Sequence, residues 1–182
     1  MTTKQLKSKV CLVGAKAVGK TSLVRRYVTN MFDERYVTTI GTRVSKKEVR
    51  VEFPERDLIA LVDLTIWDIM GEMGFRELLQ DAYFYGANGI LAVADVTRRG
   101  TLDDLDDWID GVIKVVGTVP ILVAVNKSDL TGTAQVREQD VVAFTKAYGA
   151  EYVLTSAKTG DRVEAAFDRL ATMAAARQLQ VS

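Results

Sequence analysis

The sequence predicts an α/β protein built on one doubly wound, mostly parallel sheet with helices on both faces. Two observations predict this class. Apolar runs alternate with helical stretches along all 182 residues, and the region 42–67 holds two alternating strands joined by Pro54-Glu-Arg-Asp57. Strands separated by helices form parallel sheets, whereas strands joined by a short turn form a hairpin. The hairpin places one antiparallel edge strand on the sheet, so we expect six strands.

The strands are recognised by short apolar runs between turn signals. Gly89-Ile-Leu-Ala-Val-Ala-Asp95 and Pro120-Ile-Leu-Val-Ala-Val125 are continuous runs, typical of strands buried on both faces. Ligands of doubly wound sheets lie at the carboxyl ends of the strands. The six expected strands are 8–13, 42–53, 58–67, 89–95, 119–125 and 151–155.

The helices are recognised by apolar residues spaced three and four apart. Leu102, Leu105, Trp108, Ile109 and Val112 follow this spacing in one stretch. A second set, Val163, Phe167, Leu170 and Met173, follows it near the end of the chain. The five expected helices are 20–29, 75–84, 102–116, 137–148 and 161–177.

Composition fits one globular domain over 1–182, with short flexible termini at 1–7 and 178–182. The chain is 48% hydrophobic, and its 24 basic residues balance its 24 acidic ones. A net charge of zero argues against broad electrostatic binding to nucleic acid. Cys11 is the only cysteine and lies in an expected strand, where it is a small core residue. There is no histidine, which excludes histidine-based acid–base catalysis and histidine-ligated metals.

The stretch Gly14-Ala-Lys-Ala-Val-Gly-Lys20-Thr21 fits the phosphate-binding pattern G-x-x-x-x-G-K-[ST]. It follows an apolar run and precedes a helical stretch, as that motif requires. Backbone N–H groups of such a loop surround phosphates, while Lys20 reaches the β- and γ-phosphates and Thr21 offers its hydroxyl to Mg²⁺. We expect the nucleotide phosphates to contact Gly14, Ala15, Lys16, Ala17, Val18, Gly19, Lys20, Thr21 and Ser22.

A second motif, Asp68-x-x-Gly71, follows the second hairpin strand. The Asp68 carboxylate can hold Mg²⁺ through water, and the Gly71 N–H can approach a γ-phosphate. Taken alone, this pattern also fits a loop aspartate with a turn glycine. Its position directly after the hairpin strand favours the metal site.

The motif Asn126-Lys127-Ser-Asp129 indicates which base is bound. Asp129 can accept hydrogen bonds from N1–H and the 2-amino group of guanine. Adenine offers neither donor, so it would leave a buried carboxylate unpaired. Asn126 can bond the base edge and tie neighbouring loops together, and Lys127 can lie along the ring. The alternative reading is a surface turn with a helix cap.

A fourth motif, Ser156-Ala157-Lys158, follows the last expected strand. The Ala157 N–H can donate to the guanine carbonyl, although the tripeptide is common and only its position supports the assignment. The four motifs together predict a site for GTP or GDP with Mg²⁺.

In this order the motifs resemble those of Ras-superfamily small GTPases, nearest to the Rab branch, over about residues 8–177. The Rab-like stretches are Tyr36-Val-Thr-Thr39-Ile40-Gly41, Ile66-Trp67-Asp68 and Ala94-Asp95-Val96-Thr97. The resemblance implies a single P-loop G domain in which Thr39 of switch I binds Mg²⁺ and senses the γ-phosphate. It also implies that Phe32 packs on the guanine, that Tyr36 closes over the phosphates, and that residues 68–84 form switch II.

The chain departs from the family at two positions. Glu72 stands where small GTPases usually carry the Gln that orients the attacking water, and a carboxylate accepts hydrogen bonds but donates none. Lys16 stands where Ras proteins carry Gly, and it would obstruct an arginine finger. Three readings stay open: both side chains point to solvent, they pair over the nucleotide, or the site serves another mechanism. The expected catalytic set is Lys16, Lys20, Gly71 and Glu72.

The chain ends and the hairpin also differ from the family pattern. No cysteine stands near Ser182, and Thr2 is not the glycine that myristoylation needs, so we expect no direct membrane anchor and a cytoplasmic location. The hairpin looks longer than in Rab proteins. One apolar set must cover the core, and the other is a candidate partner surface. The two sets are Ile59, Leu61 and Trp67, and Ala60, Val62, Leu64 and Ile66.

We therefore expect a switch protein that binds GTP or GDP with Mg²⁺ and hydrolyses GTP slowly. An effector would read switch I and switch II, with an exchange factor or activating protein as further partners, and with no nucleic acid. One rival is a GTP-loaded scaffold that hydrolyses almost nothing. A second rival is an ATP-dependent kinase or ATPase, against which Asn126 and Asp129 argue.

Overall fold

In a computed structural model, which describes residues 1–33, 42–69 and 80–181, six strands form one sheet in the order β2-β3-β1-β4-β5-β6. β2 and β3 pair antiparallel, and every other neighbouring pair is parallel. This arrangement confirms the predicted fold class. The strands are β1 (Thr2–Val13), β2 (Thr42–Phe53), β3 (Leu58–Ile69), β4 (Gly89–Asp95), β5 (Ile121–Asn126) and β6 (Glu151–Leu154).

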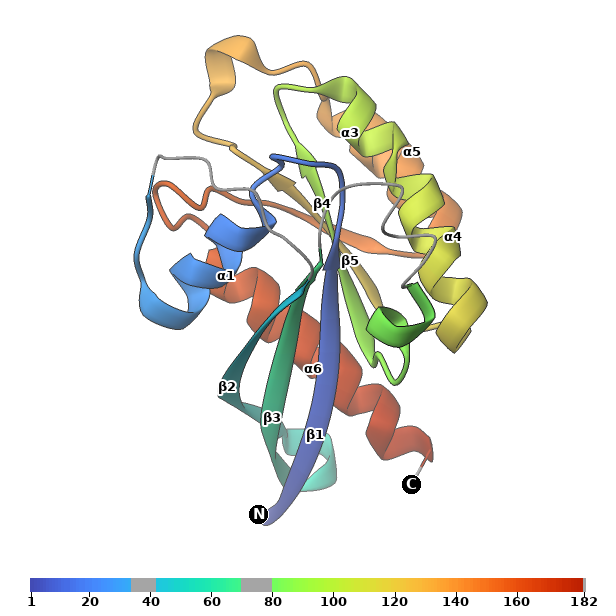
Figure 1. Ribbon diagram of the computed structural model, residues 1–182. Helices are drawn as coiled ribbons and strands as arrows, with labels where there is room; N and C mark the ends of the chain where they lie inside the picture. The colour runs from blue at the N-terminus through green and yellow to red at the C-terminus, as the bar shows by residue number, and fades with distance from the viewer. Residues whose placement is uncertain (34–41, 70–79, 182) are drawn as a thin grey trace.

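Helices lie on both faces of the sheet, with α1 and α6 on one face and α4 and α5 on the other (Figure 1). The helices are α1 (Lys20–Thr29), α3 (Arg99–Asp103), α4 (Leu105–Val116), α5 (Glu138–Tyr148) and α6 (Val163–Val181), with 3₁₀ turns η1 (Pro54–Arg56) and η2 (Thr131–Thr133). Residues 80–84 are also helical, while the remainder of the expected helix 75–84 lies outside the described residues. Within the described part of the chain, no helix is both long and apolar enough to cross a membrane.

The core divides into two apolar clusters because alternate residues of each buried strand point to opposite faces. In β1, Val10 and Leu12 pack toward α6, whereas Cys11 and Val13 pack toward the opposite cluster. Cys11 is fully buried, as expected of a core residue. Phe167 is the largest fully buried side chain of the cluster that packs on α6. Trp108 of α4 is the largest fully buried side chain of the opposite cluster.

Both ends of the described chain differ from the expected short flexible termini. Residues 2–7 belong to β1 and pair with β3 from Thr2 opposite Leu58 onward. Residues 178–181 belong to α6, where the Gln178 side chain accepts from Ser8 Oγ at 3.0 Å and donates to the Lys7 carbonyl at 2.9 Å. The long hairpin explains the difference, because it offers β1 a longer partner strand and gives α6 a longer face to cover.

The hairpin buries the set of apolar residues that faces α6. Ala60, Val62, Leu64 and Ile66 are each at most 1% exposed. The opposite set of Ile59, Leu61 and Trp67 is half-buried rather than open. The Lys9 ammonium lies 3.7 Å from the centre of a Trp67 ring, so a cation covers part of that face.

Candidate nucleotide and metal site

The described residues of all four motifs lie at the carboxyl ends of parallel strands, on one rim of the sheet. The phosphate loop connects β1 to α1, Asp68 lies near the end of β3, and Asn126 ends β5. Ser156 follows β6 by two residues. The upper part of Figure 1 shows these loops side by side above the strands. The predicted convergence of the motifs is therefore present in the fold.

Two glycines allow the phosphate loop to come close to its neighbours. Gly14 has φ +144° and Gly19 has φ +102°, values that residues with a side chain rarely adopt. A Cβ atom at Gly14 would collide with the Val93 carbonyl, and one at Gly19 would collide with the Asn126 amide. The loop can therefore lie directly against β4 and β5 only with glycine at these two positions.

Lys20 opens α1 and directs its ammonium back into the loop. Its Nζ donates to the carbonyls of Gly14 at 2.9 Å and Ala15 at 3.1 Å, and the side chain is buried. Burial lowers the pKa of Lys20 to about 8, with Asp68 opposing the shift. A buried cation held inside a curved loop of backbone N–H groups suits an anionic ligand.

Thr21 and Asp68 form a pair of oxygen donors beside Lys20. The Thr21 hydroxyl donates to Asp68 Oδ2. Asp68 is 2% exposed, and its Oδ1 has no hydrogen-bond partner among the described residues. Burial raises the pKa of this carboxyl, against the effects of Thr21 and Lys20. A buried carboxylate oxygen without a partner beside a hydroxyl fits a hard divalent cation such as Mg²⁺, which prefers oxygen ligands.

Few protein groups contribute to this metal site. Within the described ranges, no group of three or more Asp, Glu, Cys or His residues is arranged to hold a metal. Mg²⁺ is typically bound by one or two carboxylates together with substrate phosphates and waters, so a single carboxylate with a hydroxyl matches that habit. Thr39, the third expected ligand, lies outside the described residues.

Asn126 ties three segments together, as the sequence suggested. Its Nδ2 donates to the Val18 carbonyl of the phosphate loop at 3.0 Å. Its Oδ1 accepts from the Thr155 hydroxyl at 3.2 Å and from the Ala157 N–H at 3.3 Å. The side chain is 2% exposed. This one amide links the phosphate loop to the loop that follows β6.

Asp129 lies where two of the motif loops meet. Ser156 Oγ donates to Asp129 Oδ1 at 2.7 Å, which orients the carboxylate and leaves its second oxygen for another donor. Asp129 is exposed in the structure, whereas our argument for guanine selectivity assumed a buried carboxylate. Any burial of Asp129 must therefore come with the bound base. The Ala157 N–H, expected to face a guanine carbonyl, donates here to Asn126.

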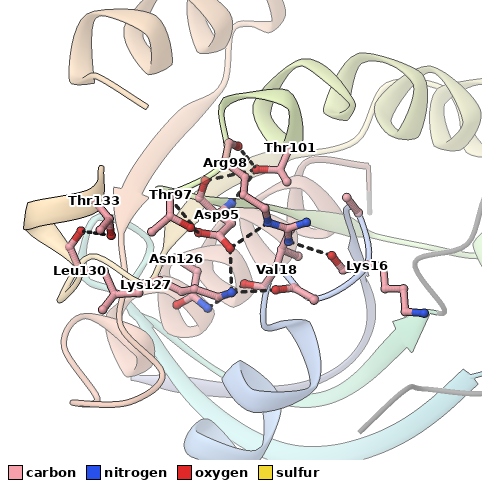
Figure 2. Close-up of polar contacts among 12 residues, drawn as sticks. Lys16, Val18, Asp95, Thr97, Arg98, Thr101, Asn126, Lys127, Leu130 and Thr133 are labelled. Atoms are coloured by element: carbon pink, nitrogen blue, oxygen red, sulfur yellow. Dashed lines mark hydrogen bonds and ion pairs between the residues drawn. The ribbon is translucent and has the colours of Figure 1, made fainter. Parts of the chain in front are cut away.

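Of the remaining predicted residues, some lie in the described part of the chain and others lie outside it. Phe32 is half-buried against the α6-side core cluster. Lys16 is exposed, and Figure 2 shows its side chain extending away from Asp95. Tyr36, Thr39, Gly71 and Glu72 lie outside the described residues, so the structure leaves the relation between Lys16 and Glu72 open.

Sequence reasoning missed three charged residues that hold the loops in place. Arg26 of α1 donates from Nε to the Ala157 carbonyl at 2.8 Å and from Nη2 to the Lys158 carbonyl at 2.5 Å. Asp95 contacts Lys127 and accepts from Arg98, and Arg98 donates in turn to the Lys16 carbonyl of the phosphate loop. Asp95 stood in a family-like stretch without any assigned role, and an aspartate that ends a buried strand before Thr97 was the only available signal.

A doubly wound sheet with a phosphate loop, a paired Thr21 and Asp68, and a separate base loop defines the class of P-loop nucleotide-binding proteins. A family model described as "Ras family" matches residues 9–176. The chain belongs to the Ras family of small GTPases.

Three curated relatives align with most of this chain. It is 37% identical over 174 residues to the human Ras-related protein Rab-36, covering 92% of this chain and 61% of Rab-36. It is 36% identical to the GTP-binding protein YPTC5 of Chlamydomonas reinhardtii, covering 91% of this chain and 81% of that protein. It is 29% identical to the Ras-related protein Rab-13 of Canis lupus familiaris, covering 90% and 77%. The predicted Rab-like resemblance is confirmed.

Proposed function

We propose that this protein is a guanine-nucleotide-dependent switch that binds GTP or GDP with Mg²⁺ and hydrolyses GTP slowly. The observation that carries the proposal is the Asn126 amide, which joins the phosphate loop to the loop after β6. The two loops that would contact the phosphates and the base are therefore already joined to each other through Asn126. Ras-family membership supports the choice of nucleotide.

Each site residue has a role under this proposal. Lys20 and the loop N–H groups stabilise negative charge on the phosphates, and Thr21 with Asp68 holds the metal. The Mg²⁺ that Thr21 and Asp68 would hold would supply positive charge to offset the phosphates. Asp129 selects guanine by accepting from its N1–H and 2-amino group, while Arg26 keeps the loop of Ala157 and Lys158 in place.

Slow hydrolysis is the finer part of the proposal. Lys16 is exposed at the phosphate loop, in the position where Ras proteins carry Gly. An exposed lysine there obstructs an arginine finger supplied by an activating protein. This feature also favours the alternative function, a GTP-loaded binding module with little hydrolysis.

The proposal extends to domain organisation and partners. We propose one domain over residues 1–182, a cytoplasmic location, and an effector that reads switch I and switch II. Members of the Ras family work with effectors, exchange factors and activating proteins, and an exchange factor or activating protein fits this chain as well.

Two assays test the proposal. Competition of GTP, GDP and ATP for a fluorescent GDP analogue tests the nucleotide class, and effective displacement by ATP would contradict the guanine assignment. A single-turnover assay with bound GTP then tests hydrolysis. Slow release of phosphate supports the switch, whereas the absence of any turnover supports the scaffold.

A further inference from the structure

Asp95, at the end of β4, is a buried carboxylate whose two oxygens are both occupied (Figure 2). Its Oδ1 accepts from the Thr97 N–H at 2.9 Å and from the Thr97 hydroxyl at 2.7 Å. Its Oδ2 contacts Lys127 Nζ at 2.7 Å and Arg98 Nε at 3.1 Å. Burial opposes ionisation, but the hydrogen bonds from Lys127 and Thr97 outweigh it and hold the pKa of Asp95 below its usual value.

Both cations on Asp95 also reach the phosphate loop. Arg98 Nη2 donates to the Lys16 carbonyl at 2.8 Å, and Lys127 Nζ donates to the Ala17 carbonyl at 2.9 Å. Two successive carbonyls of the loop are thus held by side chains that share one carboxylate. We call Asp95, Arg98 and Lys127 the brace. It connects the ends of β4 and β5 to the phosphate loop.

The segments that the brace joins have unusual backbone conformations. Ala17 has φ 63° and Lys127 has φ 66°, in the left-handed region that residues other than glycine seldom adopt. Such conformations persist only where surrounding contacts hold them. The turn that carries Arg98 is itself held, because Thr101 Oγ1 accepts from the Asp95 N–H at 2.9 Å and donates to the Arg98 carbonyl at 2.7 Å.

We propose that Arg98 is a positioning residue for nucleotide retention: it fixes the Lys16 end of the phosphate loop and so slows the release of bound GDP. The inference rests on the proposed function and names a residue that controls release from the same site. Arg98 acts through the Lys16 carbonyl and the Asp95 carboxylate. Its planar fork serves the two acceptors from two separate nitrogens, Nε and Nη2, whereas a lysine in its place would have to serve both from one ammonium.

The expected effect of removing Arg98 follows from the exposure of Arg98 and of its partner Asp95. Arg98 is 43% exposed, and exposed ion pairs contribute little to stability. Its partner Asp95 is 1% exposed, however, and keeps Lys127 and Thr97 when Arg98 is removed. We therefore expect the fold to tolerate the loss of Arg98, whereas the Lys16 carbonyl loses its side-chain anchor. Loss of Arg98 should therefore change the rate of nucleotide release more than the stability of the fold.

Arg99 provides a matched control for Arg98. It is the next residue, is 45% exposed, and pairs with Asp140 at 3.0 Å and Asp103 at 3.8 Å, remote from the phosphate loop. Replacing either arginine by alanine removes one exposed cation and its ion pairs. If general stability alone governed release, the two variants would release GDP at similar rates.

The test preloads the parent protein, Arg98→Ala, Arg98→Lys and Arg99→Ala with a fluorescent GDP analogue and chases with excess GDP in Mg²⁺. Loss of a hydrogen bond to a charged group predicts release about tenfold faster in Arg98→Ala than in the parent. Arg99→Ala should match the parent, and Arg98→Lys should lie between. Thermal midpoints of the two alanine variants, measured in parallel, should lie close together.

The outcomes separate this inference from the function on which it rests. A parent protein that retains no analogue would overturn the proposed function and the inference together. A parent that retains it while Arg98→Ala releases it no faster than Arg99→Ala would overturn the inference alone. Should Arg98→Ala fail to fold, Arg98→Lys decides, because release at the parent rate would show that the two-acceptor fork is unnecessary.

Discussion

At the scale of single residues, Asp129 is where the structure most sharpens the nucleotide assignment. Ser156 donates to one carboxylate oxygen and the side chain is exposed, so the carboxylate is oriented and keeps acceptor sites for the donors of guanine. Asp129→Asn should weaken GTP binding by roughly tenfold to a hundredfold, because the amide presents a donor to the 2-amino group of guanine. The same variant should favour xanthosine triphosphate, whose 2-oxo group accepts a hydrogen bond.

Competition of GTP and xanthosine triphosphate for a fluorescent nucleotide measures this change. Asp110→Asn, an exposed aspartate on α4, removes the same charge away from the rim and should leave both affinities unchanged. If Asp129→Asn binds GTP as tightly as the parent, Asp129 does not read the base.

Glu72 and Lys16 lead to a prediction about rate. If the missing hydrogen-bond donor at Glu72 limits hydrolysis, Glu72→Gln should raise the single-turnover rate. A tenfold gain would correspond to about 1.4 kcal/mol of barrier. Lys16→Gly should change the rate differently in the parent and in Glu72→Gln if the two side chains act as a pair. A slower Glu72→Gln variant would instead show that the carboxylate itself positions the water.

The motifs predict the residues of the candidate site, but not the residues that hold its loops in place. Lys20, Thr21 and Asn126 occur at fixed spacings, because phosphates and bases have fixed shapes. Arg98 and Arg26 act on backbone carbonyls of loops that are distant in sequence, 82 and 131 residues away. No spacing rule relates such partners, so their roles become visible only when the loops are brought together in the fold.

At the scale of elements, some boundaries match the predicted ones, whereas others are set by tertiary contacts that the sequence pattern does not show. β2, β4 and α1 begin and end where the sequence predicted. The expected helix 102–116 begins earlier, at Arg99, and is divided into α3 and α4 at Asp104. Near this start, the Thr101 hydroxyl accepts from the Asp95 N–H and donates to the Arg98 carbonyl, and such contacts are not visible in the apolar spacing used for the prediction.

The far end of the long hairpin offers an element-scale prediction. Phe53, the last residue of β2, is 7% exposed and belongs to the core cluster that packs on α6. Phe53→Ala should lower the free energy of unfolding by about 3–5 kcal/mol, as expected for a core phenylalanine. Glu52→Ala, at the exposed neighbour, should change it by no more than about 0.5 kcal/mol. Urea unfolding followed by circular dichroism measures both.

Equal costs for the Phe53 and Glu52 variants would mean that the hairpin end does not unfold with the core. The expected inequality reflects the joint extension of β1, the hairpin and α6. The longer β1 pairs with the longer hairpin strand β3, and the end of α6 contacts β1, so the sheet and the covering helix extend together.

At the scale of the whole molecule, the rim is joined by side chains as well as by the sheet. Asn126 links the β5 end to the phosphate loop, Arg26 links α1 to the loop after β6, and the brace links β4 and β5 to the phosphate loop. These contacts join the loops of the candidate site to one another as well as to the strands.

The pH dependence of stability tests this connection, because Asp95 is its buried charge. The pKa of Asp95 is lowered in the folded protein relative to its usual value of about 3.9. The unfolded chain therefore binds the proton more readily, so the stability that this ionised carboxylate contributes is present above its usual pKa and is lost as pH falls through the folded one. The chain has no histidine, so no other side chain of ordinary pKa titrates between about pH 5 and 7 to obscure the comparison.

Asp95→Asn should accordingly lower the free energy of unfolding by about 2 kcal/mol near neutral pH, since hydrogen bonds to Lys127 and Arg98 lose their charged acceptor. The difference from the parent should stay constant from about pH 7 to 5 and shrink below about pH 4, as the parent carboxylate gains its proton. Urea unfolding across this range measures the difference, with Asp110→Asn as an exposed control that shows little effect at any pH. A difference that stays constant down to about pH 3 would show that Asp95 contributes through its shape and hydrogen bonds rather than through its charge.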